Sequence, residues 1–151
     1  MWEVLVYNLI SRDADYDLIP FLKDSGTAFT VYNPLAGGML TGKQTRDKAE
    51  EGSRFDTEEG YRRRYWREST FRALDRMAEI SAETGIPQTS LALRWLISKD
   101  YITCIIIGCS RISHLEQNLS FLEDGSLSED ILSELDALWN CICGDYFRYH
   151  A

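Results

Sequence analysis

Residues 4–34, VLVYNLISRDADYDLIPFLKDSGTAFTVYNP, decide the fold of this chain. Two short apolar runs in this stretch, 4–7 and 28–32, contain β-branched residues and predict buried strands. Between them, an acidic entry and an apolar stripe through Leu22 predict a helix that Gly26 can end. A strand, a helix and a strand in this order, with short connections, form a βαβ unit, which requires a parallel sheet.

Downstream, the apolar pattern predicts a third strand at 103–107, closed by Gly108, and several more helices. The strands are continuous apolar runs, so we expect them to be buried on both faces, with Cys104 in the core. The helices are indicated by residues at helical spacing: Phe71, Leu74, Met77 and Ala78, then Leu91, Ala92, Trp95 and Leu96, then Ile112, Leu115, Leu119 and Leu122, and finally Leu132, Leu135 and Trp139.

The composition predicts one globular domain over residues 1–151, because 44% of the residues are hydrophobic. A net charge of −8 argues against nucleic acid as a partner, and the absence of a run of about 20 apolar residues argues against a membrane span. The four cysteines form no CxxC pair and no secretory leader follows Met1, so we expect reduced thiols, no metal site and a cytoplasmic location. The stretch 33–68 is rich in glycine and charge and is expected to be a long functional loop.

Residues 32–43, YNPLAGGMLTGK, directly follow the second predicted strand and form the first candidate site. Glycines let the backbone approach a ligand closely, so that amide groups can point at a phosphate. Lys43 adds a positive charge, and Tyr32 offers a flat face on which an aromatic ring can stack. The alternative interpretation is a glycine-rich turn with a surface lysine and a core tyrosine.

Residues 107–111, IGCSR, follow the third predicted strand and form the second candidate site. Ser110 and Arg111 lie at a predicted helix N-terminus, where free amides and the helix dipole favour an anion. Further along this helix, His114 and two amide residues, Gln117 and Asn118, could reach the base or ribose of a nucleotide. The alternative makes Ser110 a helix cap and leaves Arg111 and Asn118 as surface polar residues.

Both candidate sites lie at the carboxyl ends of predicted parallel strands, where α/β sheets bind ligands. Each combines close access to the backbone with a cation. A nucleotide that carries a pyrophosphate needs such a pair of sites, so the two together favour a dinucleotide ligand.

At these residues the sequence resembles the aldo-keto reductase superfamily. Residues 32–43 resemble the seventh-strand motif of that family, and 107–118 resemble its eighth-strand motif. Residues 52–55, GSRF, resemble the loop between them, 7–9 resemble the end of the sixth strand, and 139–149 resemble the C-terminal segment. The resemblance covers essentially the whole chain.

The resemblance implies an α/β fold that is part of a (β/α)8 TIM barrel, with three parallel strands and covering helices, and it implies NADP(H) as cofactor. By resemblance, Tyr32 stacks on the nicotinamide, Arg54 approaches from the long loop, and Ser110 with Arg111 binds the 2′-phosphate. The other positions that it implies lie along the pyrophosphate and toward the adenine: Asn33, Pro34, Leu35, Gly37, Lys43, Gly108, His114, Gln117 and Asn118.

No position here matches the family's catalytic residues, so the chain is expected to bind NADP(H) without reducing carbonyl compounds by itself. The expected partners are a separate N-terminal barrel half, or a second copy that associates through open sheet edges. Two alternatives remain open. One is a non-catalytic binding or assembly module derived from such a reductase, and the other is an unrelated small α/β protein with coincidental motifs.

Overall fold

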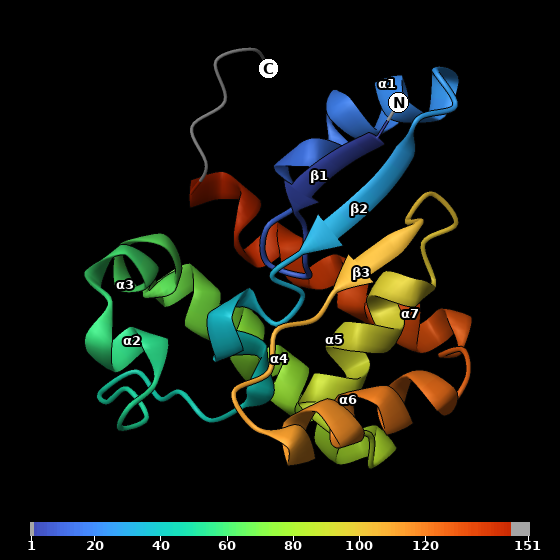
Figure 1. The fold of residues 1–151 in the computed structure, drawn as a ribbon. Helices are drawn as coiled ribbons and strands as arrows, with labels where there is room; N and C mark the ends of the chain where they lie inside the picture. Colours follow the sequence, from blue (N-terminus) through green and yellow to red (C-terminus); the bar gives the residue numbers. More distant parts are fainter. Residues whose placement is uncertain (1, 146–151) are drawn as a thin grey trace.

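The fold is built on a parallel sheet of three strands, which the computed structural model describes within residues 2–145 (Figure 1). The strands β1 (Trp2–Val6), β2 (Ala28–Tyr32) and β3 (Cys104–Ile106) lie in the order β1-β2-β3. The α/β class and the parallel βαβ unit predicted from the sequence are therefore confirmed.

Helices occupy most of the remaining chain. Beside β1 and β2 lie η1, a 3₁₀ helix (Asp13–Asp15), and α1 (Leu18–Asp24). The predicted helices further on are present as α4 (Glu68–Thr84), α5 (Gln88–Ile97), α6 (Ile112–Glu123) and α7 (Glu129–Ala137). The chain then continues through η3 (Leu138–Cys141) and η4 (Cys143–Asp145). Residues 146–149 of the C-terminal segment that carries part of the resemblance lie outside the described residues.

The segment 33–68, expected to be a long loop, contains three short helical segments: η2 (Ala36–Thr41), α2 (Arg54–Thr57) and α3 (Glu59–Tyr65). An aromatic cluster orders them. Phe55 is fully buried, and its ring centroid lies 5.9 Å from that of Tyr61 and 5.8 Å from that of Trp66. This irregularly spaced cluster is a tertiary contact, so helical periodicity gave no sign of it.

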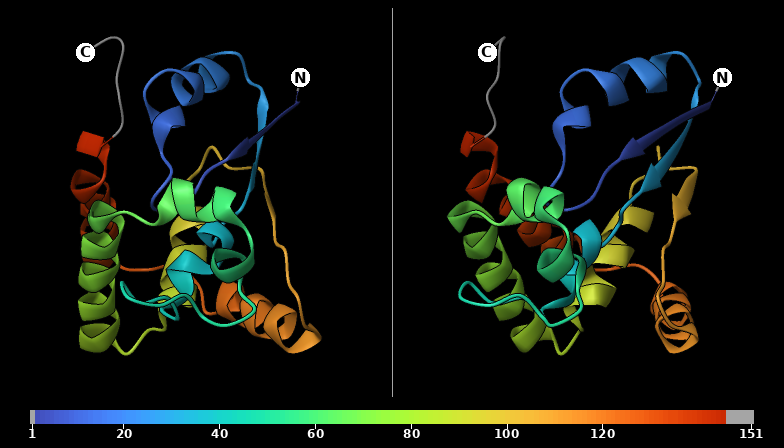
Figure 2. Two further views of the ribbon diagram at one scale, coloured as in Figure 1. Left: turned by 90° about the vertical axis from the view of Figure 1, so that its left-hand side faces the viewer. Right: turned by 60° about the vertical axis from the view of Figure 1, so that its left-hand side comes forward.

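One face of the sheet is buried and the other is open. In the register of the sheet, Leu5, Val31 and Ile105 lie side by side and pack in the core. Figure 2 (left) shows the sheet almost edge-on, with α4, α5 and α7 on this side. Because side chains alternate along a strand, the neighbouring row faces the other way. There Tyr32 is 43% exposed and Ile106 49% exposed.

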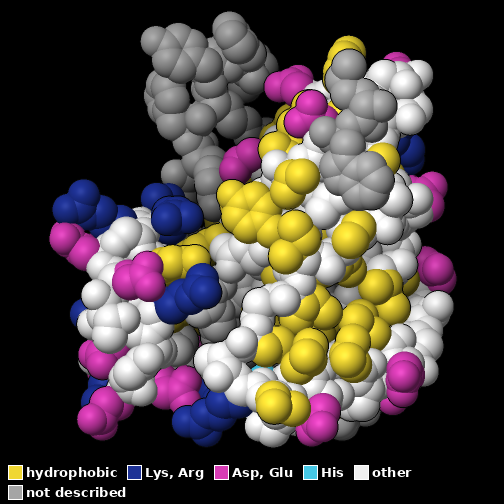
Figure 3. Space-filling model, viewed as in Figure 1, with side chains coloured by type: hydrophobic (Ala, Val, Ile, Leu, Met, Phe, Trp, Pro, Cys, Tyr) yellow, Lys and Arg dark blue, Asp and Glu magenta, His cyan; other side chains and the backbone are white. Residues whose placement is uncertain are grey.

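The prediction that all strands are buried on both faces is therefore wrong, and so is the placement of Cys104 in the core, since this residue is exposed. The apolar stripe of α6 is exposed as well, with Ile112 at 77%. Ala78 of α4 is also exposed, and Ala73 and Ile80 are buried there instead. On this side of the sheet Val4 is exposed as well, whereas Thr30 in the central strand is buried. Figure 3 shows the resulting band of hydrophobic side chains, which runs from the strands down to α6.

A polar network locks the buried side of the sheet to α5 and α7. Asp136 accepts hydrogen bonds from Trp95 Nε1 at 2.9 Å and from Lys99 at 3.1 Å, and it pairs with Arg12 at 2.9 Å. Partial burial alone would raise the pKa of Asp136, but these hydrogen bonds and the two cations outweigh it and lower the pKa below 3.8.

Within residues 2–145, no helix is both long and apolar enough to cross a bilayer.

Asp136→Asn is expected to make the stability of the fold less dependent on pH in acid. The lowered pKa means that the ionised carboxylate stabilises the fold above pH 3.8, and that this contribution is lost as the pH falls through the folded-state value. Thermal melting followed by circular dichroism, at neutral pH and near pH 3, measures the difference. Asp130→Asn on the same helix is the control, because Asp130 makes none of these bonds. Equal acid sensitivity of the wild type and Asp136→Asn would contradict the assignment.

Candidate functional site

The two candidate segments lie at the same edge of the sheet. Tyr32 at the end of β2 is in register with Ile106 at the end of β3, so η2 and α6 both start from the carboxyl ends of adjacent strands (Figure 1). The exposed ring of Tyr32 shows that it is not the core tyrosine of the alternative interpretation. The sequence therefore predicted correctly that both segments follow the carboxyl ends of neighbouring strands.

The turn after β2 is held by hydrogen bonds of Asn33. This residue has a φ of 60°, which is unusual for a residue other than glycine. Its Oδ1 accepts a hydrogen bond from the Gly37 amide at 2.6 Å, and its Nδ2 donates to the Tyr65 hydroxyl at 3.0 Å. Its carbonyl accepts from Nδ2 of the fully buried Asn8 at 2.9 Å. The polar groups of Asn33 are thus used to shape the turn.

Asn8 and Tyr65 were missed by the sequence reasoning. Asn8 follows β1 closely and could have been found as a polar residue just beyond a strand end, where Asn33 also lies. Tyr65 comes from α3, and its hydroxyl also accepts from Ser11 at 3.2 Å. It therefore ties the segments after β1 and β2 together.

Other residues of the first segment differ in exposure. Pro34 is buried, and the carbonyl of the half-buried Leu35 accepts hydrogen bonds from the amides of Gly38 and Leu40. Lys43 is half exposed and pairs with Glu50 at 3.5 Å, a weak contact for an exposed pair. The lysine can exchange this partner for a ligand at low cost.

Gly37 is in close contact with Tyr61 of α3. Gly37 has a φ of 70°, and a Cβ built there would lie 2.5 Å from Tyr61 Cε1. Arg54, on α2, has its guanidinium carbon 5.2 Å from the centre of the same ring. The segment 33–68 thus folds back onto the turn that follows β2.

The second segment starts α6 with exposed groups. Gly108, Ser110 and Arg111 are exposed, and Arg111 occupies the N-cap position without a side-chain hydrogen bond to the helix. The alternative in which Ser110 caps the helix is therefore wrong. The Arg111 guanidinium makes no ion pair with a carboxylate among residues 2–145.

The amide residues of α6 lie in different surroundings. Asn118 is only 4% exposed and donates a hydrogen bond to Cys109 Sγ at 3.4 Å, so it is not a surface residue. His114 is half-buried, and Gln117 is exposed. The structure therefore leaves Gln117 accessible, whereas Asn118 holds the connection between β3 and α6.

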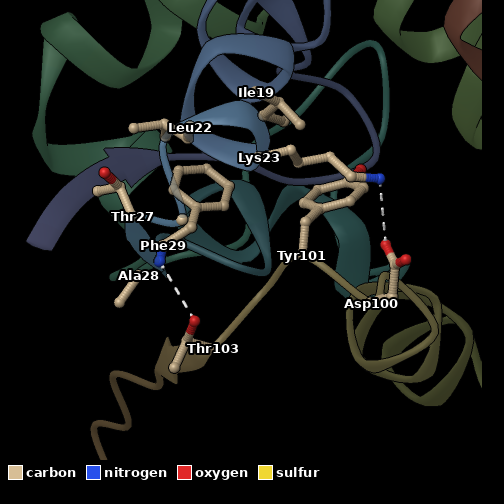
Figure 4. Close-up of a pocket in the computed structure, with 10 residues that line it drawn as sticks. Ile19, Leu22, Lys23, Thr27, Ala28, Phe29, Asp100, Tyr101 and Thr103 are labelled. Atoms are coloured by element: carbon tan, nitrogen blue, oxygen red, sulfur yellow. Dashed lines mark hydrogen bonds and ion pairs between the residues drawn. The ribbon is translucent and has the colours of Figure 1, made fainter.

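A hollow of about 420 Å³ lies at the other end of the sheet, near the amino ends of β2 and β3 (Figure 4). Its polar groups have partners within the chain. The Lys23 ammonium lies 3.6 Å from the Asp100 carboxylate and 5.3 Å from the Tyr101 ring centre. The Thr103 hydroxyl accepts a hydrogen bond from the Phe29 amide at 3.2 Å. Since ligands of such sheets bind at the carboxyl ends of the strands, this hollow is not the candidate site.

Comparisons with known proteins give the family and the fold of the chain. The model of the Aldo/keto reductase family matches residues 3–140. An aldo-keto reductase from Pseudocercospora fijiensis is 36% identical over 90% of this chain and 49% of its own length. Aflatoxin B1 aldehyde reductase member 2 from Mus musculus is 35% identical over 95% of this chain and 44% of its own length.

The fold comparison gives the same result. The holo form of an aldo-keto reductase from Bacillus halodurans superposes with a TM-score of 0.67 at 19% identity, over 91% of this chain and 42% of that one. The predicted fold, part of a TIM barrel, is confirmed. The chain spans about half the length of the curated relatives it matches. By its sequence and its fold, this chain belongs to the aldo/keto reductase family of oxidoreductases.

Proposed function

We propose that this chain forms the NADP(H)-binding portion of an aldo-keto reductase. The observation that carries the proposal is the register between Tyr32 and Ile106, which brings two exposed, cation-bearing segments to one edge of the sheet. One segment ends in Lys43, and the other ends in Arg111 at the start of α6. NADP(H) can present a phosphate to each segment, because its pyrophosphate and its 2′-phosphate lie apart.

The exposed residues fit the cofactor by their chemistry. Tyr32 offers an open ring on which the nicotinamide can stack. Lys43 and Arg54 provide cations for the pyrophosphate, and Ser110 with Arg111 holds the 2′-phosphate at the start of α6.

The remaining predicted site residues shape or border the cofactor site. Asn33, Pro34, Leu35 and Gly37 set the form of the turn, and Gly108 leaves room beside α6. Asn118 fixes the segment that carries Arg111, and His114 and Gln117 lie toward the adenine. When bound, the cofactor supplies the hydride for reduction of a carbonyl group.

We further propose that the open face of the sheet packs against additional parallel strands, from a separate N-terminal barrel half or from a second copy. Two observations support this: the face lacks charged side chains among its paired residues 4, 6, 30, 32, 104 and 106, and large hydrophobic residues are exposed on it. Contiguous exposed apolar side chains of this kind mark interaction sites on proteins. The same observations favour the second candidate function, a non-catalytic assembly module. The cytoplasmic location stays a prediction.

The isolated chain is expected to bind NADPH without oxidising it when a carbonyl compound is added, because no general acid of the family has a counterpart here. A fluorescence titration with NADPH, size-exclusion chromatography and an absorbance assay with a panel of aldehydes measure binding, assembly and turnover. A chain that associates but ignores NADPH would support the assembly module. Robust aldehyde-dependent oxidation of NADPH would contradict the proposal that the isolated chain binds the cofactor without turnover.

A further inference from the structure

The helix α6 exposes an apolar stripe to solvent. Ile112, Leu115 and Leu119 are 77%, 41% and 48% exposed. Among residues 2–145, each of the other helices exposes at most one large hydrophobic side chain, such as Phe21 of α1. Figure 3 shows that the hydrophobic side chains of α6 continue the band on the open face of the sheet. The stripe therefore extends an interaction surface from the strands onto a helix.

The stripe has the spacing of a contact between two helices. Its residues, 112, 115, 119 and 122, recur at intervals of three and four, as the a and d positions of a coiled coil do. On one side of the stripe, Asn118 is buried and donates a hydrogen bond to Cys109, so this side of α6 faces the rest of the chain. The other side is open to a second helix along its length.

The open side of the stripe is bordered by two carboxylates. Glu116 and Glu123 are exposed and lie seven residues apart, so they share one face of α6, next to the apolar residues. Neither forms an ion pair with another residue of the described chain. In the sequence, residues 112–145 contain no lysine or arginine. In Figure 3, acidic side chains lie beside the lower end of the hydrophobic band. The apolar stripe thus has a negatively charged border.

The charge of this border discriminates between possible occupants. Two copies of α6 packed on each other would bring like charges to one contact, which is unfavourable. An anionic lipid surface would be repelled for the same reason, since helices that lie on membranes flank their apolar face with lysine and arginine. A helix with basic residues beside its own apolar stripe would gain both apolar burial and complementary charge.

We propose that α6 docks an amphipathic helix of a different protein chain, one that carries lysine or arginine beside its apolar stripe. This inference rests on the assembly proposed for the open face of the sheet, because it names the element and the charge that the partner presents there. At α6, the charge of the border selects a separate chain over a second copy.

A synthetic amphipathic peptide of about three heptads tests the contact, with leucine at a and d and lysine at e and g. A second peptide carries glutamate in place of lysine, and a third keeps the lysines but has serine at a and d. Fluorescence anisotropy of each labelled peptide, titrated with the chain, measures binding. The peptide with leucine and lysine is expected to bind about tenfold more tightly than either of the others.

Glu116→Lys with Glu123→Lys reverses the charge of the border. This double variant is expected to prefer the glutamate peptide over the lysine peptide, because the attractive and repulsive pairs are exchanged. Asp24→Lys with Glu83→Lys is the matched control, since it makes the same change in net charge in the last turns of α1 and α4. The control should keep the preference of the wild type for the lysine peptide.

Leu115→Ala with Leu119→Ala shortens the apolar stripe. It is expected to weaken binding of the lysine peptide about tenfold, because less apolar surface is buried in the contact. Both side chains are already partly exposed in the chain, so the fold should be retained, and melting curves check this.

NADPH, titrated in parallel, separates this inference from the proposed function. If the lysine peptide binds through α6 but NADPH does not bind, the docking site stands and the proposed function fails. If NADPH binds but Glu116→Lys with Glu123→Lys leaves the peptide preference unchanged, the docking site is overturned. Self-association that is lost in Leu115→Ala with Leu119→Ala would also overturn it, because a second copy would then occupy the stripe. Sedimentation of the chain with phosphatidylserine vesicles, lost in the same variant, would overturn it in favour of a lipid surface.

Discussion

Trp95→Ala is expected to destabilise the fold by about 3 to 5 kcal/mol, because truncation of a large buried aromatic residue leaves a cavity. Trp95 is fully buried on α5, and its ring stacks on that of Tyr7 with the centroids 5.6 Å apart. The truncation also removes the Nε1 donor to Asp136 and the surface over which the Lys99 ammonium lies at 4.5 Å. A small domain is stable by about 5 to 15 kcal/mol, so this one change removes a large share. Urea unfolding followed by circular dichroism measures the loss.

Trp95→Phe is the matched control for the tryptophan. It keeps an aromatic ring in the core but removes the hydrogen bond to Asp136 and part of the buried indole volume, so we expect a smaller loss of about 1 to 2 kcal/mol. If Trp95→Ala and Trp95→Phe lose the same amount, ring packing against Tyr7 does not hold the sheet to α5.

The double change Lys43→Ala with Arg111→Ala is expected to lower the affinity for NADPH roughly a hundredfold. Each removes a charge-assisted hydrogen bond of about 1.5 kcal/mol or more, and 1.4 kcal/mol corresponds to a factor of about ten in affinity. The residues follow different strands, so their effects should add. Both are exposed, so the fold should be unchanged.

Lys48→Ala with Arg72→Ala is the control for net charge. These residues are exposed, lie away from the two strand ends in sequence, and carry the same total charge. The control should bind NADPH within about threefold of the wild type, because screened charges at a distance contribute little. Equal losses in both double variants would show that NADPH senses only the overall charge.

The sequence predicted the central βαβ unit well, because periodicity and turn residues act locally. The second strand was placed at residues 28–32, where β2 lies, and the helix before it ends just before Gly26. The apolar run of β3 was also found. The exposure of β3 was not predicted, because an apolar run indicates only that a strand is suited to burial. Whether another element covers it depends on what packs there, and in the described chain Ile106 stays 49% exposed.

The sequence predicted where the candidate site lies better than it predicted the contacts that its residues make. Tyr32 and Arg111 lie at the expected strand ends with exposed side chains. One of the hydrogen bonds of Asn33 goes to Tyr65, which lies 32 residues further along the chain on α3. Similarly, Asn118 is buried and donates a hydrogen bond to Cys109, and helical spacing reveals neither. Local sequence rules identify residue types near a ligand, but the partners of polar side chains are set by tertiary structure.

The most direct test of the account uses the two halves of the cofactor as separate ligands. If the segments after β2 and β3 hold opposite ends of one dinucleotide, Arg111→Ala should weaken binding of adenosine 2′-monophosphate about tenfold and leave nicotinamide mononucleotide unaffected. Lys43→Ala should do the reverse, and both changes should weaken NADPH. If each variant weakens both fragments equally, or if neither fragment responds to either variant, the two segments do not share one dinucleotide.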